Sequence, residues 1–178
     1  MKILIGIAAT ILVLIIFISM RPSVFRVSRS TVISAPSEVV FEQVNDLHKW
    51  EAWSPWAKMD PTAKNSYEGP AAGTGAVMRW DGNQNVGAGS MTITESRPSE
   101  MVAFRLEFLK PFKGTSAAEF TFKPQGNQTA VTWTMTGENN FIAKAIGLFM
   151  NCDKMVGGQF DQGLAQLNSI AETIAKKS

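Results

Sequence analysis

Hydrophobic and polar residues alternate along five successive segments between Thr74 and Gly137. Side chains of a β-strand point alternately to opposite faces, so this period of two predicts an antiparallel sheet with one buried face and one wet face. Turn signals between the segments, such as Asp81-Gly82-Asn83 and Gln125-Gly126-Asn127, predict hairpins. The large apolar side chains expected on the buried face are Met78, Trp80, Met91, Ile93, Phe104, Leu106, Phe108, Phe120, Phe122, Val131, Trp133 and Met135.

Short helices are predicted before this block. Ser34-Ala35-Pro36-Ser37-Glu38 places Pro and an acid in a first turn, which predicts a helix that ends near Asp46. A second short helix or turn follows over Leu47–Trp53, and alternation over Phe25–Ser34 predicts a strand ahead of both. The order of one strand, short helices, about six strands and a final helix is an α+β arrangement.

The last stretch, from Phe141 to Lys176, repeats apolar residues every three or four positions and predicts an amphipathic helix against the sheet. Gly157, Gly158 and Gly163 lie inside it, although glycine weakens a helix. These glycines predict either a break near Asn151 or a close approach between this helix and the sheet.

The first twenty residues form a separate element. Ile3–Met20 is an uninterrupted run of 18 residues without a charged side chain. As a helix it would be roughly 27 Å long, close to the ~30 Å hydrocarbon core of a bilayer. The alternative is a cleaved signal peptide, but Ile18-Ser19-Met20-Arg21 is a poor cleavage site. We expect residues 1–22 to form a transmembrane anchor and residues 23–178 to form one domain.

The charged residues beside this run indicate on which side of the membrane the domain would lie. Arg21, Arg26 and Arg29 follow it, whereas Lys2 and the amino terminus precede it. The positive-inside rule therefore favours a cytoplasmic domain, although large domains translocate largely regardless of charge.

Composition excludes several classes of function. The formal net charge is +2 and no block of like charges occurs, so we expect no nucleic-acid partner. Cys152 is the only cysteine, which excludes an internal disulfide and a Cys-rich metal cluster. His48 is the only histidine, and its polar neighbours predict a solvated surface side chain rather than a general base. We predict no catalytic residue, no cofactor and no metal site.

A wide, curled sheet covered by one helix often encloses a hollow, which aromatic and methionine side chains would line. Solid core packing is the alternative for the same residues. By strand parity Arg79, Arg105 and Glu107 point outward, whereas Glu95 either points inward or lies in water at the rim. The residues predicted to line a ligand cavity are Trp53, Trp56, Trp80, Phe104, Phe108, Phe120, Trp133, Met135, Phe149 and Val156.

Five segments carry a family resemblance: Ala35-Pro36 with Val40-Phe41, Trp53-Ser54-Pro55-Trp56, Gly87–Glu95, Phe108–Phe112 and Trp133–Gly137. On these residues the chain from Val24 to Ala175 resembles the SRPBCC superfamily, which includes START lipid-transfer domains and polyketide cyclases, and in particular its small bacterial membrane-anchored members. The resemblance implies the helix-grip fold, in which a curved antiparallel sheet of about six to seven strands and a long C-terminal helix enclose a deep apolar cavity. It implies a binding protein more strongly than an enzyme, because the matching segments are not catalytic motifs.

The leading hypothesis is therefore a membrane-anchored domain that binds a hydrophobic or amphipathic, lipid-like small molecule. One alternative is a cyclase or dehydratase that acts in the same cavity, which requires an inward titratable group with a shifted pKa. Another is a protein-interaction or stress-response module with a filled core. The expected partners are an apolar small molecule and, through Ile3–Met20, a membrane. Phe112 stands beside lysines at a predicted hairpin tip, where it would contact a bilayer or the cavity mouth unless it packs within its turn.

Overall fold

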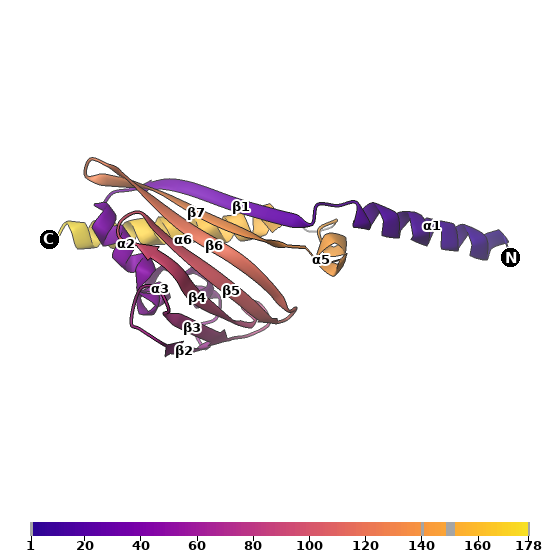
Figure 1. Cartoon of the computed structure of the whole chain (residues 1–178), viewed down its shortest axis with the longest axis horizontal. Helices are drawn as coiled ribbons and strands as arrows, with labels where there is room; N and C mark the ends of the chain where they lie inside the picture. The colour runs from indigo at the N-terminus through magenta and orange to yellow at the C-terminus, as the bar shows by residue number, and fades with distance from the viewer. Residues whose placement is uncertain (1, 140, 149–151, 178) are drawn as a thin grey trace.

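The computed structural model describes residues 2–139, 141–148 and 152–177. One curved sheet forms its centre (Figure 1), and every neighbouring pair of strands is antiparallel, in the order β1-β7-β6-β5-β4-β3-β2. The strands are β1 (Val24–Ile33), β2 (Lys64–Glu68), β3 (Val77–Asp81), β4 (Ala88–Arg97), β5 (Met101–Lys110), β6 (Gly114–Gln125) and β7 (Gln128–Glu138). The expected α+β architecture with six to seven strands is confirmed.

Turns join each strand to the next in the series from β3 to β7, at the positions that the sequence predicts. One of them contains Gly126, whose φ of 62° suits glycine in a tight turn. The strand pattern has one consequential irregularity: the register between β4 and β5 shifts between Ile93 and Glu95. Such a bulge adds a residue and turns the following side chains to the other face. Glu95 therefore lies in water with its side chain 54% exposed, 3.2 Å from Arg97, and does not point into the fold.

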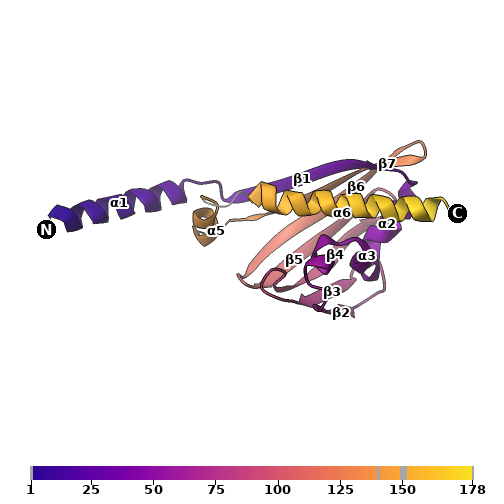
Figure 2. The ribbon, with the colours of Figure 1, turned by 180° about the vertical axis from the view of Figure 1, so that it is seen from behind.

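Helices cover the concave face of the sheet (Figure 2). The long α6 (Cys152–Ala175) crosses this face beside β1, and α2 (Ser37–Asn45) packs against both α6 and β6. A 3-10 turn, η1 (Leu47–Lys49), then leads into α3 (Trp50–Trp53) and α4 (Pro55–Met59). Pro55 occupies the first turn of α4, where its missing N–H costs no hydrogen bond. Both α3 and α4 contact α6, so the short helices and α6 form one layer.

Aromatic side chains fill the part of the space between these layers that lies beneath α2 and α3. Phe104 and Phe120 are at most 1% exposed, and the Trp50 ring lies edge-on to both, with centroids 5.4 and 5.9 Å apart. The indole N–H of Trp50 donates to Val44 O at 2.8 Å, and that of Trp53 donates to Gln43 O at 3.0 Å. Because both indoles satisfy their polar atom, this packing fixes α3 to α2 and to the sheet.

The C-terminal region is divided into two helices, and one of its glycines lies close to the sheet. A short helix, α5 (Phe141–Ile146), is separate from α6, so Phe141–Lys176 is not one helix. Residue 151, where the break was expected, lies outside the described residues. A Cβ on Gly163 would lie 2.9 Å from the Trp133 ring and 3.1 Å from Pro55 Cδ, so a larger residue there would keep α6 from its neighbours.

The first helix, α1 (Lys2–Ser19), projects away from the domain (Figure 1), and the side chains from Ile11 to Phe17 are 45–65% exposed. Lys144 Nζ on α5 donates to Ser19 O at 3.3 Å and to Ser23 Oγ at 2.9 Å. No helix in the described part of the chain is both long enough and apolar enough to cross a membrane. The transmembrane anchor expected at Ile3–Met20 is therefore not supported by the structure.

Candidate functional site

A cavity of about 240 Å³ lies on the concave side of the sheet, beside the aromatic core. Its walls come from the inner face of the sheet, from α3, α4 and the loop after α4, and from the first half of α6. The lining residues are Trp50, Glu51, Ser54, Trp56, Ala57, Asp60, Pro61, Ala63, Asn65, Met78, Trp80, Val86, Met91, Leu106, Phe108, Ala118, Trp133, Met135, Val156 and Phe160. Most of this wall is aromatic or aliphatic, which is typical of sites for small organic molecules.

The structure brings six of the ten predicted lining residues to this cavity: Trp56, Trp80, Phe108, Trp133, Met135 and Val156. Trp53, Phe104 and Phe120 lie instead in the core beside it and are at most 1% exposed. Strand parity identifies the face on which a side chain lies, but not its distance from the packed end of the sheet. It therefore does not distinguish residues that line the cavity from residues that lie in the core. Phe149 lies outside the described residues. A role for any of these residues in ligand binding stays a prediction.

Several lining residues were absent from that prediction. The alternation places Met78, Met91 and Leu106 on the inner face, and the helical stripe includes Phe160, so a signal for these four existed. No periodic signal pointed to the polar lining residues in short helices and loops, because those segments have no regular face.

Two glycines allow the aromatic wall to form. Trp80 lies opposite Gly89 in the β3–β4 register, and a Cβ on Gly89 would collide with Glu107 O of β5 and lie 2.6 Å from the Trp80 ring. Trp80 then meets Phe108 edge to face, with centroids 6.0 Å apart. Across the cavity, Gly163 admits Trp133, whose ring stacks on Phe160 with centroids 3.9 Å apart and an interplanar angle of 6°. A side chain on either glycine would displace a tryptophan of the wall.

Asp60 is a buried carboxylate in the wall, with 5% of the residue exposed. Its Oδ1 accepts hydrogen bonds from the Thr62 hydroxyl at 2.7 Å and the Thr62 N–H at 3.1 Å, and its Oδ2 accepts one from the Asn83 N–H at 2.6 Å. The Thr62 hydroxyl, followed by the Asn83 amide, lowers the pKa of Asp60 despite its desolvation. Asp60 is therefore ionised at neutral pH, and it ties the end of α4 to the β3–β4 loop.

The exposed lining residues mark the mouth of the cavity. Glu51, Pro61 and Asn65 are exposed, whereas Met91 and Ala118 deep in the wall are buried, so the mouth lies between α3–α4 and β2.

Tyr67 on β2 is partly buried and lies within the influence of two acidic side chains, one of which lines the cavity. Burial, and then the negative charges of Glu51 and Asp46, raise the pKa of Tyr67. The His48 ring stacks on Tyr67 with centroids 4.0 Å apart, and the His48 side chain is 52% exposed. The predicted surface position of His48 is confirmed, and this histidine does not line the cavity.

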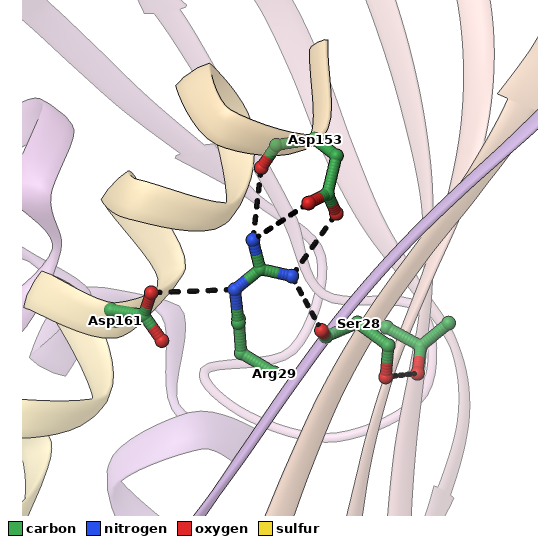
Figure 3. Close-up of polar contacts among 5 residues, drawn as sticks. Ser28, Arg29, Asp153 and Asp161 are labelled. Atoms are coloured by element: carbon green, nitrogen blue, oxygen red, sulfur yellow. Dashed lines mark hydrogen bonds and ion pairs between the residues drawn. The ribbon is translucent and has the colours of Figure 1, made fainter. Parts of the chain in front are cut away.

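Arg29 holds the first turns of α6 against β1 (Figure 3). Its Nη1 and Nη2 each donate to one carboxylate oxygen of Asp153 at 3.1 Å, its Nη2 also donates to Asp153 O at 3.0 Å, and its Nε donates to Asp161 Oδ2 at 3.3 Å. The guanidinium passes over Gly157, where a Cβ would collide with it. Because Val156 and Phe160 of the same turns line the cavity, this contact positions that wall.

Comparison with protein families gives one match over residues 24–172, to a family described as polyketide cyclase / dehydrase and lipid transport. The chain belongs to this family. The match confirms the helix-grip fold of the SRPBCC superfamily, and it covers the whole sheet and nearly all of α6. A comparison with curated proteins finds no significant match.

Solved structures of this fold are similar in architecture. Protein CV1439 from Chromobacterium violaceum superimposes with a TM-score of 0.60 at 18% identity, over 85% of this chain and 99% of the other. The Aha1 dimer from Colwellia psychrerythraea gives 0.60 at 16% identity, over 83% and 96%. The di-domain ARO/CYC StfQ from the steffimycin biosynthetic pathway gives 0.63 at 11% identity, over 86% of this family member and 52% of StfQ. At these identities the likeness establishes the fold alone.

Proposed function

We propose that this protein binds a small hydrophobic or amphipathic molecule in the cavity beneath α6. The observation that carries the proposal is the hollow of about 240 Å³ lined by aromatic and methionine side chains. A protein-interaction module with a filled core would leave no such space. The family description, which includes lipid transport, supports the same conclusion.

The volume also bears on ligand size. Ligand pockets are roughly 300–1,000 Å³, so a cavity of about 240 Å³ lies just below the usual range. It suits a single ring system or a short chain rather than a whole two-chain lipid. The open mouth beside Glu51 and Asn65 leaves room for a polar end to reach water.

A cyclase- or dehydratase-type reaction is the second candidate, and the family description, which names polyketide cyclase / dehydrase, favours it. The titratable groups in the described lining are Glu51 and Asp60. Asp60 has both carboxylate oxygens occupied and a lowered pKa, whereas general acid–base catalysis favours a pKa near the working pH. Binding without chemistry is therefore the function that the geometry supports best.

Two leucines on the same strand allow a matched test of binding. Leu106 lines the cavity, whereas Leu109 is 56% exposed and is not among the lining residues. We expect Leu106→Trp to fill the cavity and to abolish both co-purification of organic molecules and binding of 2-naphthylmethanol. Leu109→Trp should retain both. Mass spectrometry of organic extracts and titration calorimetry on the full-length protein measure these outcomes, and equal binding by the two variants would exclude the cavity as the site.

We also propose that α1 holds the domain at a membrane. The exposed apolar side chains of α1 support this, as does Phe112, which is 60% exposed at the β5–β6 turn between Lys110 and Lys113. Cell fractionation of the full chain should place it in the membrane pellet, and the double variant Ile11→Asp/Leu14→Asp should move it to the supernatant. Met59→Asp, at an exposed position of the domain, is the control that should stay with the membrane. An unchanged distribution in the double variant would contradict the role of α1.

A further inference from the structure

The ionisable residues of the cavity wall carry one sign of charge. Glu51 and Asp60 line the cavity, and no Lys, Arg or His belongs to the lining in the part of the chain that the structure describes. The whole chain has a formal net charge of +2, so the acidic wall is a local feature and not a reflection of overall composition.

From this wall we infer that the cavity selects its ligand by charge. It takes a small amphipathic molecule whose polar end is a cation, such as an amine or a quaternary ammonium group, in preference to a carboxylate of the same shape. The inference rests on the proposed binding function and adds the chemical class of the ligand.

Neither acidic side chain is neutralised by a basic one. Among the ion pairs of the described residues, none includes Glu51 or Asp60. The hydrogen-bond donors to Asp60 are the neutral groups of Thr62 and Asn83. A bound ammonium would therefore meet uncompensated negative charge, whereas a bound carboxylate would be desolvated without a positive partner.

The lysines nearest in sequence do not neutralise the negative charge of the cavity wall. Lys64 lies between two lining residues, but it lines a second groove that shares Asn65 and Trp80 with the cavity. The other two cations of that groove are paired, Arg79 with Glu68 and Lys110 with Asp81. Lys58 is exposed on α4 and does not line the cavity. Near the mouth, the negative charges of Glu51 and Asp46 act on Tyr67, where they add to the larger effect of burial in raising its pKa.

The aromatic wall favours the same class of ligand. Indole faces attract cations more strongly than other aromatic faces do. The Trp133 ring is stacked between Phe120, at 4.6 Å, and Phe160, at 3.9 Å, so its faces are occupied. Trp56 and Trp80 meet other described rings edge to face only, and they are the indoles best placed for a cation. The apolar part of the ligand would lie deeper, against Met91 and Ala118.

Three probes of matched shape test the charge preference: the neutral 2-naphthylmethanol, the cation (2-naphthylmethyl)trimethylammonium and the carboxylate anion of 2-naphthaleneacetic acid. Titration calorimetry would use the full-length protein in one neutral detergent. We expect the cation to bind most tightly and the carboxylate most weakly. Glu51→Gln should weaken binding of the cation by roughly fivefold, the order expected of one charge contact near water. Glu51→Lys should reverse the order of cation and carboxylate.

Glu119 supplies the matched control, because it is exposed and lies on β6 between Ala118 and Phe120, whose side chains point to the inner face. Glu119→Gln should leave all three affinities unchanged. If the alcohol binds and the carboxylate binds as tightly as the cation, the charge selectivity is wrong while the proposed binding function stands. If none of the three binds, the binding function itself fails, and the inference fails with it.

Discussion

Gly157 and Gly158 are neighbours on α6 with different surroundings. A Cβ on Gly157 would collide with the Arg29 guanidinium, whereas a Cβ on Gly158 would meet no described atom within 4 Å. We expect Gly157→Ala to change the free energy of unfolding less favourably than Gly158→Ala does, because its Cβ would push aside the Arg29 side chain and cost its exposed ion pairs, each of which contributes little. Gly158→Ala should raise this free energy by roughly 0.5–1 kcal/mol, because alanine is the better helix former. Urea unfolding measures both, and similar shifts in the two variants would contradict the Arg29 contact.

The pair of Arg29 and Asp153 makes part of the stability depend on pH. The hydrogen bond from Arg29 lowers the pKa of Asp153 in the folded chain from its ordinary value of 3.8. The stability that this ion pair contributes is therefore complete above the ordinary pKa of 3.8, and it is lost as the pH falls through the lower pKa of the folded state. In Arg29→Met the pKa of Asp153 should rise toward the ordinary value, which a carboxyl NMR titration of both proteins would detect. An unchanged titration would show that the ion pair does not form in solution.

At the scale of secondary-structure elements, periodicity predicted the strands, and turn residues predicted the hairpins. Periodicity joined α5 and α6 into one helix, and only the glycines of that stretch offered a break as one of two alternatives. Periodicity did not predict the bulge after Ile93, because one extra residue in a strand leaves the local alternation on either side intact. It also did not separate cavity wall from core. Phe104 and Phe108 share one face of β5, yet only Phe108 reaches the cavity, because that difference depends on how α3 packs against the sheet.

The hairpin of β3 and β4 offers a test at this scale. Gly89 leaves room for the Trp80 ring and for Glu107 O of β5, so Gly89→Ala should displace both Trp80 and the neighbouring backbone of β5. We expect the variant to unfold at lower urea concentration and to bind 2-naphthylmethanol several-fold more weakly. Gly114→Ala is the control, because a Cβ on Gly114 would meet no described atom within 4 Å. If Gly89→Ala binds the probe as the wild type does, the position of Trp80 is not important for the cavity.

At the scale of the whole molecule, α6, the short helices and the sheet enclose a hollow whose existence the family resemblance implied. The polar character of that hollow could not be predicted from the sequence. Glu51 lies on a short helix and Asp60 in the turn that follows another, and only the folded chain brings both to one wall. The sequence therefore predicts much of the apolar wall, and the structure adds the two acidic side chains that lie on it.

The central claim is that a small molecule binds inside the cavity. The chain has nine methionines, of which Met78, Met91 and Met135 line the cavity, whereas Met59 and Met155 are 39% and 53% exposed. Methyl-labelled methionine NMR of the full-length protein would follow each of these groups as 2-naphthylmethanol is added. The account predicts shifts and contacts to the probe at Met78, Met91 and Met135, with Met59 and Met155 unchanged. Shifts confined to Met59 and Met155, or none at any methionine, would contradict it.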